Sequence, residues 1–148
     1  MVSLVPPHGT DSLKPRLLPK TERAAEIERA ARLKRVPLSS REVSDLFMLG
    51  MGAYTPLEGF MGEADWRGSC EHMTLENGLF WPIPITVSCE QLLGDSIAIG
   101  EDVALHDGET GELLGILRVE EKYAIDREFE CSHVFRTTDT AHPGVEKV

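Results

Sequence analysis

The segment that most constrains this chain is residues 50–62, Gly-Met-Gly-Ala-Tyr-Thr-Pro-Leu-Glu-Gly-Phe-Met-Gly. Its glycines rule out a long helix, and its aromatic and methionine side chains are too apolar for a solvated linker. Thr55, Pro56 and Glu58 match a helix start, with a cap, a proline at the first helical position and an acid reaching back. The pattern therefore predicts a buried loop-to-helix corner joining two halves of one domain. We expect its glycines to allow close packing, so Gly59→Val should destabilise the chain.

A ligand-binding loop is the less favoured interpretation of the same segment. Its glycines do not follow the Gly-x-Gly-x-x-Gly spacing after a strand, and no Gly-Lys-Ser/Thr follows them as a phosphate loop requires.

Before this corner the chain predicts helices. Prolines keep residues 1–20 extended, and Thr21 is placed to cap a surface helix over residues 22–34. Ser39 and Glu42 predict a capping box that starts a second helix. That helix should bury one face, formed by Val43, Leu46, Phe47 and Gly50. A short helix from residue 63 to about 70 should point Trp66 inward.

After the corner the pattern changes to strands. Asn77-Gly78 is a strong hairpin signal between residues 73–75 and 79–81. Residues 82–89 alternate as an edge strand, with one face formed by Ile83, Ile85, Val87 and Cys89. A second hairpin is predicted from residues 103–106 and 113–119, and Asp126 should cap a last short helix that carries Phe129. The predicted fold class is α+β, with N-terminal helices followed by an antiparallel β-rich sheet or barrel.

Charge and cysteine content limit the partners and the compartment. The 148 residues carry a net charge of −10, unevenly placed: residues 1–35 hold eight Lys/Arg against four Asp/Glu, and the rest holds seven against twenty-one. Such an acidic body predicts no binding of nucleic acid or of an anionic membrane. Three cysteines, no apolar run of membrane-spanning length and no secretory signal predict a cytoplasmic protein.

Few residues have the types and spacing of a chemical site. Cys70 with His72, and Cys131 with His133, are zinc-ligand types, but residues two apart on a helix point in different directions. His106 beside Asp102 and Asp107 could be an oriented catalytic histidine, although an exposed hairpin histidine is the favoured interpretation. The three cysteines are expected to be small buried apolar groups. We therefore predict no catalytic, cofactor-binding or metal-binding residue in the chain.

Five segments together resemble the N-terminal domain of the ATP sulfurylase (sulfate adenylyltransferase) family. They occur in the family's order over nearly the whole chain: Pro7-His8-Gly9, residues 52–61, residues 73–78, Trp81-Pro82-Ile83-Pro84-Ile85, and residues 138–145. The resemblance implies a PUA-like domain over residues 1–148, incomplete at its C-terminal end. It implies a full-length nucleotidyltransferase of sulfur metabolism and sulfate assimilation. That enzyme joins Mg-ATP and sulfate into adenosine 5′-phosphosulfate and diphosphate, or runs in reverse in sulfur oxidation.

The family's catalytic signatures, Gln-x-Arg-Asn, His-x-x-His and Gly-Arg-Asp-His, belong to a following ATP-binding catalytic domain, and this sequence contains none of them. The resemblance therefore implies a structural segment that is inactive alone, binds no cofactor itself, and packs against its own catalytic domain and a subunit of a homo-oligomer.

Two other interpretations stay open on the sequence alone. The chain could be a stand-alone PUA-like binding module that contacts RNA through the basic residues 23–35. It could also be an acidic regulatory or docking protein whose partner is not a catalytic domain of its own.

Overall fold

A three-stranded mixed sheet is the centre of the first part of the fold. The computed structural model describes residues 5–148. Within them, β1 (Lys34–Leu38) pairs in parallel with β2 (Asp102–Asp107), and β2 pairs antiparallel with β3 (Leu113–Arg118). The β2–β3 pair confirms the predicted second hairpin. The predicted antiparallel sheet or barrel is wrong, because the parallel partner β1 makes the sheet mixed and the strand order β1-β2-β3 leaves it open.

The chain divides into two compact units, each built from two stretches of sequence. One unit holds the chain up to Phe60 together with Val87–Glu120, and the other holds Met61–Thr86 together with Glu121–Val148. The boundary at residues 60 and 61 falls inside the glycine-rich segment.

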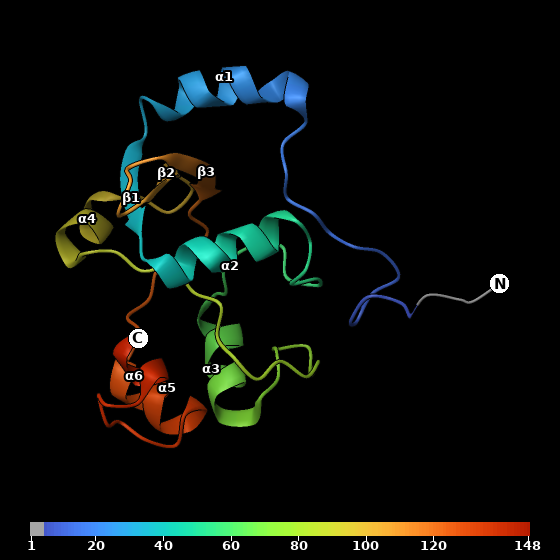
Figure 1. Cartoon of the computed structure of the whole chain (residues 1–148), viewed down its shortest axis with the longest axis vertical. Coiled ribbons are helices and arrows are strands. Elements are labelled where there is room, and N and C mark those ends of the chain that lie inside the picture. Colours follow the sequence, from blue (N-terminus) through green and yellow to red (C-terminus); the bar gives the residue numbers. More distant parts are fainter. Residues whose placement is uncertain (1–4) are drawn as a thin grey trace. The chain divides into compact units, whose positions relative to one another are not determined.

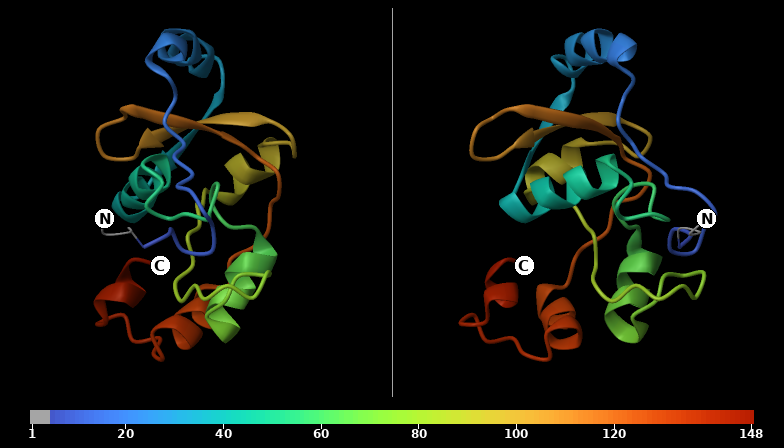
Figure 2. Two further views of the ribbon diagram at one scale, coloured as in Figure 1. Left: turned by 90° about the vertical axis from the view of Figure 1, so that its right-hand side faces the viewer. Right: turned by 45° about the vertical axis from the view of Figure 1, so that its right-hand side comes forward.

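In the first unit the sheet lies between α1 (Lys20–Ala30) on one side and α2 (Ser40–Gly50) and α4 (Gln91–Ser96) on the other (Figures 1 and 2). The core forms on the side of α2 and α4. Its buried members are Val36, Leu38, Ile97, Val103 and Leu105, and the side chains packed against it include Val43, Leu46 and Leu93. Burial of such aliphatic side chains is the main favourable term in folding, at about 1.5–3 kcal/mol each.

The N-terminal helix is shorter than its pattern predicts. It begins after Pro19 with no side-chain cap, so Thr21 lies inside it, and it ends at Ala30. Residues 34–38 form β1 instead, with Val36 and Leu38 buried and Arg35 and Pro37 exposed. This alternation has the period of a strand.

The second helix has the predicted capping box and part of the predicted face, because Val43 and Leu46 pack against the core. Ser39 Oγ accepts from the Glu42 amide, and the Glu42 carboxylate accepts from the Ser39 amide at 2.8 Å. The helix buries Glu42, Asp45 and Leu49, whereas Phe47 is 55% exposed. The predicted burial of Phe47 is therefore wrong, because polar side chains with specific partners occupy the inward positions.

The second unit contains α3 (Glu63–His72), α5 (Arg127–Val134) and the short α6 (Pro143–Glu146). Trp66 on α3 is only 1% exposed, and Asp126 accepts from the Phe129 amide at 2.9 Å, so both predictions are confirmed. Helices α3 and α5 lie side by side (Figure 2).

The Asn77-Gly78 hairpin forms as a tight turn rather than a strand pair. Gly78 has φ 83°, and one isolated antiparallel bridge joins Thr74 to Phe80. The predicted strand over residues 82–89 is wrong. Pro84, Ile85 and Thr86 are buried in succession while Ile83 is exposed, so alternation between two faces does not hold.

Across residues 5–148, no helix combines the length and the apolar composition that a membrane crossing requires.

Candidate functional site

The glycine-rich segment forms a turn, not the predicted helix start. Thr55 is 3% exposed, and its hydroxyl donates to the Gly52 carbonyl at 2.7 Å and accepts from the Lys14 amide at 2.9 Å. The Thr55–Pro56 peptide bond is cis. Because its hydroxyl is engaged in this way, Thr55 does not cap a helix, and Glu58 points away from it.

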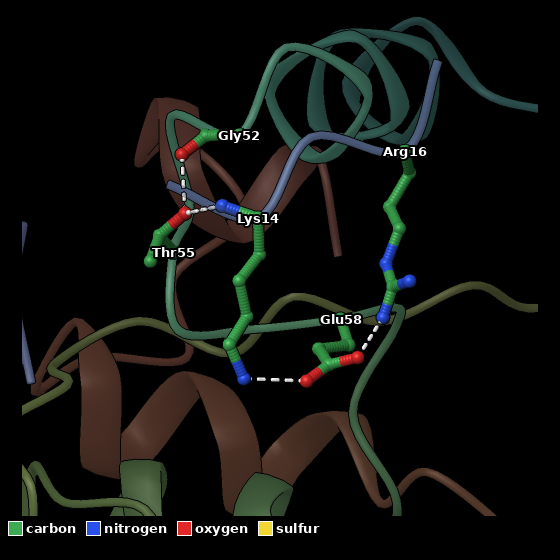
Figure 3. Close-up of polar contacts among 5 residues, drawn as sticks. All are labelled: Lys14, Arg16, Gly52, Thr55 and Glu58. Atoms are coloured by element: carbon green, nitrogen blue, oxygen red, sulfur yellow. Dashed lines mark hydrogen bonds and ion pairs between the residues drawn. The ribbon is translucent and has the colours of Figure 1, made fainter. Parts of the chain in front are cut away.

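Glu58 instead forms ion pairs with two basic side chains of the extended N-terminal segment. Lys14 Nζ and an Arg16 guanidinium nitrogen each pair with a different oxygen of its carboxylate (Figure 3). The hydrogen bond from Lys14 and the charge of Arg16 lower the pKa of the Glu58 carboxyl. The Arg16 amide also donates to the Gly50 carbonyl at 2.8 Å. These contacts attach residues 14–16, which we name the strap, to the turn.

Glycine is required at one position of this turn. Gly52 has φ 80°, and a Cβ there would lie 3.0 Å from the Pro15 nitrogen of the strap. Gly59 is different, because a Cβ there would meet no atom within 4 Å. The expected close packing at Gly59, on which the Gly59→Val prediction rests, is therefore wrong, and the close approach is at Gly52.

Two buried carboxylates on α2 hold polar partners from other segments. Glu42, 3% exposed, accepts from the amide and hydroxyl of Ser39 and from the amide and hydroxyl of Ser88, over 2.7–3.0 Å. Asp45 accepts from the Tyr54 hydroxyl at 3.0 Å. Burial raises the pKa of Asp45, and burial beside Asp45 raises the pKa of Tyr54 to about 12.

A third buried carboxylate lies in the second unit. Trp66 Nε1 donates to Glu130 at 2.7 Å, and Glu130 is 2% exposed. Burial, with Glu130 nearby, raises the pKa of the Cys70 thiol to about 12. Burial likewise raises the pKa of Tyr123, whose hydroxyl donates to the Met61 carbonyl at 2.8 Å. A thiol with so high a pKa is protonated at neutral pH and is a poor nucleophile.

The cysteine and histidine pairs of the sequence do not converge. Cys70 and Cys131 are buried as predicted, but Cys89 is exposed, which corrects the third expectation. His72 is exposed. His133 Nδ1 lies 2.8 Å from the Phe129 carbonyl, so this nitrogen donates to it. No group of three or more His, Cys, Asp or Glu side chains in residues 5–148 has the arrangement of a metal site.

His106 contacts neither neighbouring acid in the arrangement of a catalytic pair. Its Nδ1 lies 3.1 Å from both the Gly111 carbonyl and an Arg35 nitrogen. The Asp107 carboxylate accepts from two amides of the hairpin turn, and hydrogen bonding lowers its pKa. Asp102 pairs with Arg29 at 2.7 Å. Both acids therefore hold local structure.

Comparison with known proteins assigns the family. The sequence profile of the PUA-like domain family matches residues 5–148. The chain belongs to this PUA-like family. A sulfate adenylyltransferase of Syntrophobacter fumaroxidans is 57% identical over 150 residues, which cover 100% of this chain and 37% of that protein. A sulfate adenylyltransferase of Chlorobaculum tepidum is 58% identical over 145 residues, which cover 97% of this chain and 36% of that protein.

A solved structure is also similar to this PUA-like chain. The hexameric APS kinase from Thiobacillus denitrificans superposes with a TM-score of 0.65 at 36% identity, over 77% of this chain and 22% of that one. The PUA-like chain thus spans about 36–37% of the length of the curated relatives it matches.

Sequence reasoning missed the polar clusters that organise this PUA-like domain. The resemblance included Glu58, but nothing in the sequence pattern linked it to Lys14 and Arg16 more than 40 residues earlier. Glu42 was recognised as a capping residue, while its second partner Ser88 was not. Glu130 had one available signal, its place between the apolar Phe129 and Cys131, since a buried acid needs a hydrogen-bond donor such as Trp66 Nε1.

Proposed function

We propose that this chain is the N-terminal, non-catalytic part of a sulfate adenylyltransferase. In the whole protein, a sulfate oxygen attacks the α-phosphorus of Mg-ATP and gives adenosine 5′-phosphosulfate and diphosphate, or the reaction runs in reverse. The segment's role is structural: it packs against its own catalytic domain and takes part in a cytoplasmic homo-oligomer. The catalytic domain, not this segment, binds Mg-ATP.

The observation that carries the proposal is the extent of identity. Relatives named sulfate adenylyltransferase are 57% and 58% identical over essentially the whole chain, yet the chain spans only 36–37% of their length. The rest of their length leaves room for the catalytic signatures that this sequence lacks. The hexameric state of the similar APS kinase supports the homo-oligomer.

The side-chain chemistry of the described residues supports a structural role. The buried carboxylates of Glu42, Asp45 and Glu130 accept hydrogen bonds from neighbouring segments. Groups that hold structure in this way are costly to disturb, because a buried polar atom without its partner costs about 1–3 kcal/mol. Such groups are poorly suited to exchange partners with a substrate.

The basic residues also support a role without nucleic acid. Arg29, Arg32 and Lys34 pair with Glu26, Glu28 and Glu101, respectively. Cations that already face carboxylates release fewer counterions from a phosphate backbone, so they contribute less to the affinity of the chain for nucleic acid.

A chimera tests the proposal. Residues 1–148 would replace the matching 37% of the Syntrophobacter fumaroxidans sulfate adenylyltransferase, and diphosphate release from Mg-ATP and sulfate would be measured. We expect the chimera to retain turnover within about tenfold of the parent, because the catalytic domain is unchanged. Residues 1–148 alone should release no diphosphate.

The unmodified parent protein and the parent lacking its matching segment are the controls. A folded chimera without activity would reject the structural assignment. Turnover by residues 1–148 alone would reject the non-catalytic one.

A further inference from the structure

The hairpin turn at Asn77-Gly78 carries the only asparagine in the sequence. Both residues are exposed. Gly78 has φ 83°, and a Cβ there would meet no atom within 4 Å, so the turn has open space at this position. An asparagine followed by glycine is chemically labile, because a glycine has no side chain to shield its peptide nitrogen from the asparagine carboxamide.

The reaction open to this pair is deamidation, and it needs only water. The Gly78 nitrogen attacks Cγ of the Asn77 side chain, and the new N–C bond closes a five-membered succinimide. The proton of the Gly78 amide passes through water to the side-chain nitrogen, which leaves as ammonia. A second water then adds to either carbonyl of the ring and opens it. The product is aspartate or isoaspartate, and nothing is oxidised or reduced.

The closed turn restrains both reacting groups. The Gly78 amide donates to the Leu75 carbonyl at 2.8 Å, a bond that must break before this nitrogen can attack. Asn77 Oδ1 accepts from the Leu79 amide at 2.9 Å, so the carboxamide cannot rotate freely toward the Gly78 nitrogen. The Leu75 amide donates to the Leu79 carbonyl at 2.8 Å and closes the turn. Attack therefore requires the turn to open.

Helix α3 fastens the turn from one side. The Asp65 carboxylate accepts from the Glu76 amide at 2.8 Å. The Thr74 amide donates to the Gly68 carbonyl at 3.2 Å, and a Cβ on Gly68 would lie 2.5 Å from the Thr74 oxygen. All of these residues belong to one compact unit. Because the Asp65 acceptor is charged and its bond is shorter, it is the stronger of the two attachments.

We propose that Asn77 is a site of spontaneous deamidation, and that opening of this turn sets its rate in the folded chain. While the turn is closed, its hydrogen bonds hold the Gly78 nitrogen and the Asn77 carboxamide apart from reaction. Each local opening exposes both groups, as local openings of folded chains expose backbone amides to solvent. This inference goes beyond the proposed function and does not depend on it.

The product would favour the open turn. It carries a new carboxylate next to Glu76 and near the Asp65 carboxylate that fastens the turn, and like charges repel each other. The isoaspartate form also adds a methylene to the backbone, which disturbs the spacing of the hydrogen bonds between Leu75 and Leu79. Reclosing the turn does not restore the amide, so the change is permanent.

The test compares deamidation of the folded 148-residue chain with that of the same chain in guanidinium chloride. Peptide mapping by mass spectrometry follows the gain of one dalton at Asn77. Asp65→Ala removes the acceptor of the Glu76 amide and keeps a good helix former in α3. Glu63→Ala, in the same turn of α3, is the matched control, because the Glu63 side chain pairs with Arg67. Circular dichroism checks that both variants are folded.

We expect the folded wild-type chain to deamidate at least about tenfold more slowly than the denatured chain, because hydrogen bonds must break first. Asp65→Ala should speed the folded-state reaction at least about threefold, since it removes one of the bonds that fasten the turn. Glu63→Ala should leave the rate unchanged, and all three chains should react alike in denaturant.

Hydrogen exchange at the Gly78 amide gives a second measurement that needs no variant. Its protection factor should match the ratio of the denatured to the folded deamidation rate, because the same opening exposes the amide to both reactions. Equal deamidation rates in the folded and denatured chains would overturn the inference. So would an unprotected Gly78 amide, or a folded Asp65→Ala chain that reacts no faster than Glu63→Ala.

Discussion

Glu42 offers the strictest test of how buried polar groups hold this domain. Its carboxylate accepts four hydrogen bonds: two from Ser39 at the start of α2 and two from Ser88 on a segment 46 residues away. Glu42→Gln keeps the size of the side chain but replaces one oxygen with an NH₂ group. Either orientation of the amide points this NH₂ at one of the two serines.

The cost follows from the donors that face the new amide. A serine hydroxyl can rotate and accept from the NH₂, but a backbone N–H cannot. The lost backbone bond to a charged acceptor is worth about 1.5–3 kcal/mol. The remaining bonds fall from charge-assisted to neutral strength, while water near the exposed serines recovers part of the loss. We expect Glu42→Gln to lower the free energy of unfolding by about 3 kcal/mol.

Thermal unfolding followed by circular dichroism measures this loss. For a chain of this size, 1 kcal/mol corresponds to roughly 2–4 °C, so Tm should fall by about 6–12 °C. Glu109→Gln makes the same chemical change at an exposed hairpin position and should leave Tm unchanged. In a double-mutant cycle, Ser88→Ala should cost about 1 kcal/mol less in the Glu42→Gln background than in the wild-type chain.

Equal melting of Glu42→Gln and Glu109→Gln would refute the reasoning, since the four hydrogen bonds would then contribute nothing to stability. Additive effects of Glu42→Gln and Ser88→Ala would show that the two residues do not interact.

Three further predictions concern the turn and its strap. Gly52→Ala should cost about 2 kcal/mol in chemical denaturation, because alanine resists a positive φ and its Cβ would press on the strap, whereas Gly59→Ala should cost less than about 0.5 kcal/mol. Glu58→Gln should speed trypsin cleavage after Arg16 severalfold by weakening the attachment of the strap, and an unchanged cleavage rate would count against that attachment. Absorbance at 295 nm should show both tyrosines still protonated in the folded chain at pH 10.5. The pKa of Tyr54 is raised from 10.0 to about 12, so the stability that protonated Tyr54 contributes is complete below pH 10 and is lost as the pH rises through about 12. Tyr54→Phe should remove this loss.

The sequence predicted the elements that depend on near neighbours. The capping box at Ser39, the Asp126 cap and the turn of the Asn77-Gly78 hairpin, though not its strands, were confirmed, because each is decided within four residues. The β2–β3 hairpin was confirmed for the same reason: its turn residues and both strands are adjacent in the chain.

The errors came from contacts between distant segments. β1 forms because β2, some 70 residues later, supplies its hydrogen bonds, and a five-residue run gives little local signal for that pairing. Thr55 was expected to cap a helix, but the strap engages its hydroxyl instead. The clusters around Glu58, Glu42 and Glu130 depend on partners between 42 and 64 residues away, so no short motif could have indicated them.

Each compact unit is made of two separate stretches of sequence, and this interleaving limits how the chain can be divided. During synthesis, β1 must wait for β2 and β3, so the first unit cannot complete its sheet until the ribosome has passed residue 118. Residues 61–86 are made before the stretch 121–148 that completes their own unit. A single cut between residues 61 and 120 therefore gives no fragment with a complete unit. A truncation after residue 120 keeps the first unit whole but leaves part of the second attached, so a deletion that isolates the first unit must also join residues 60 and 87.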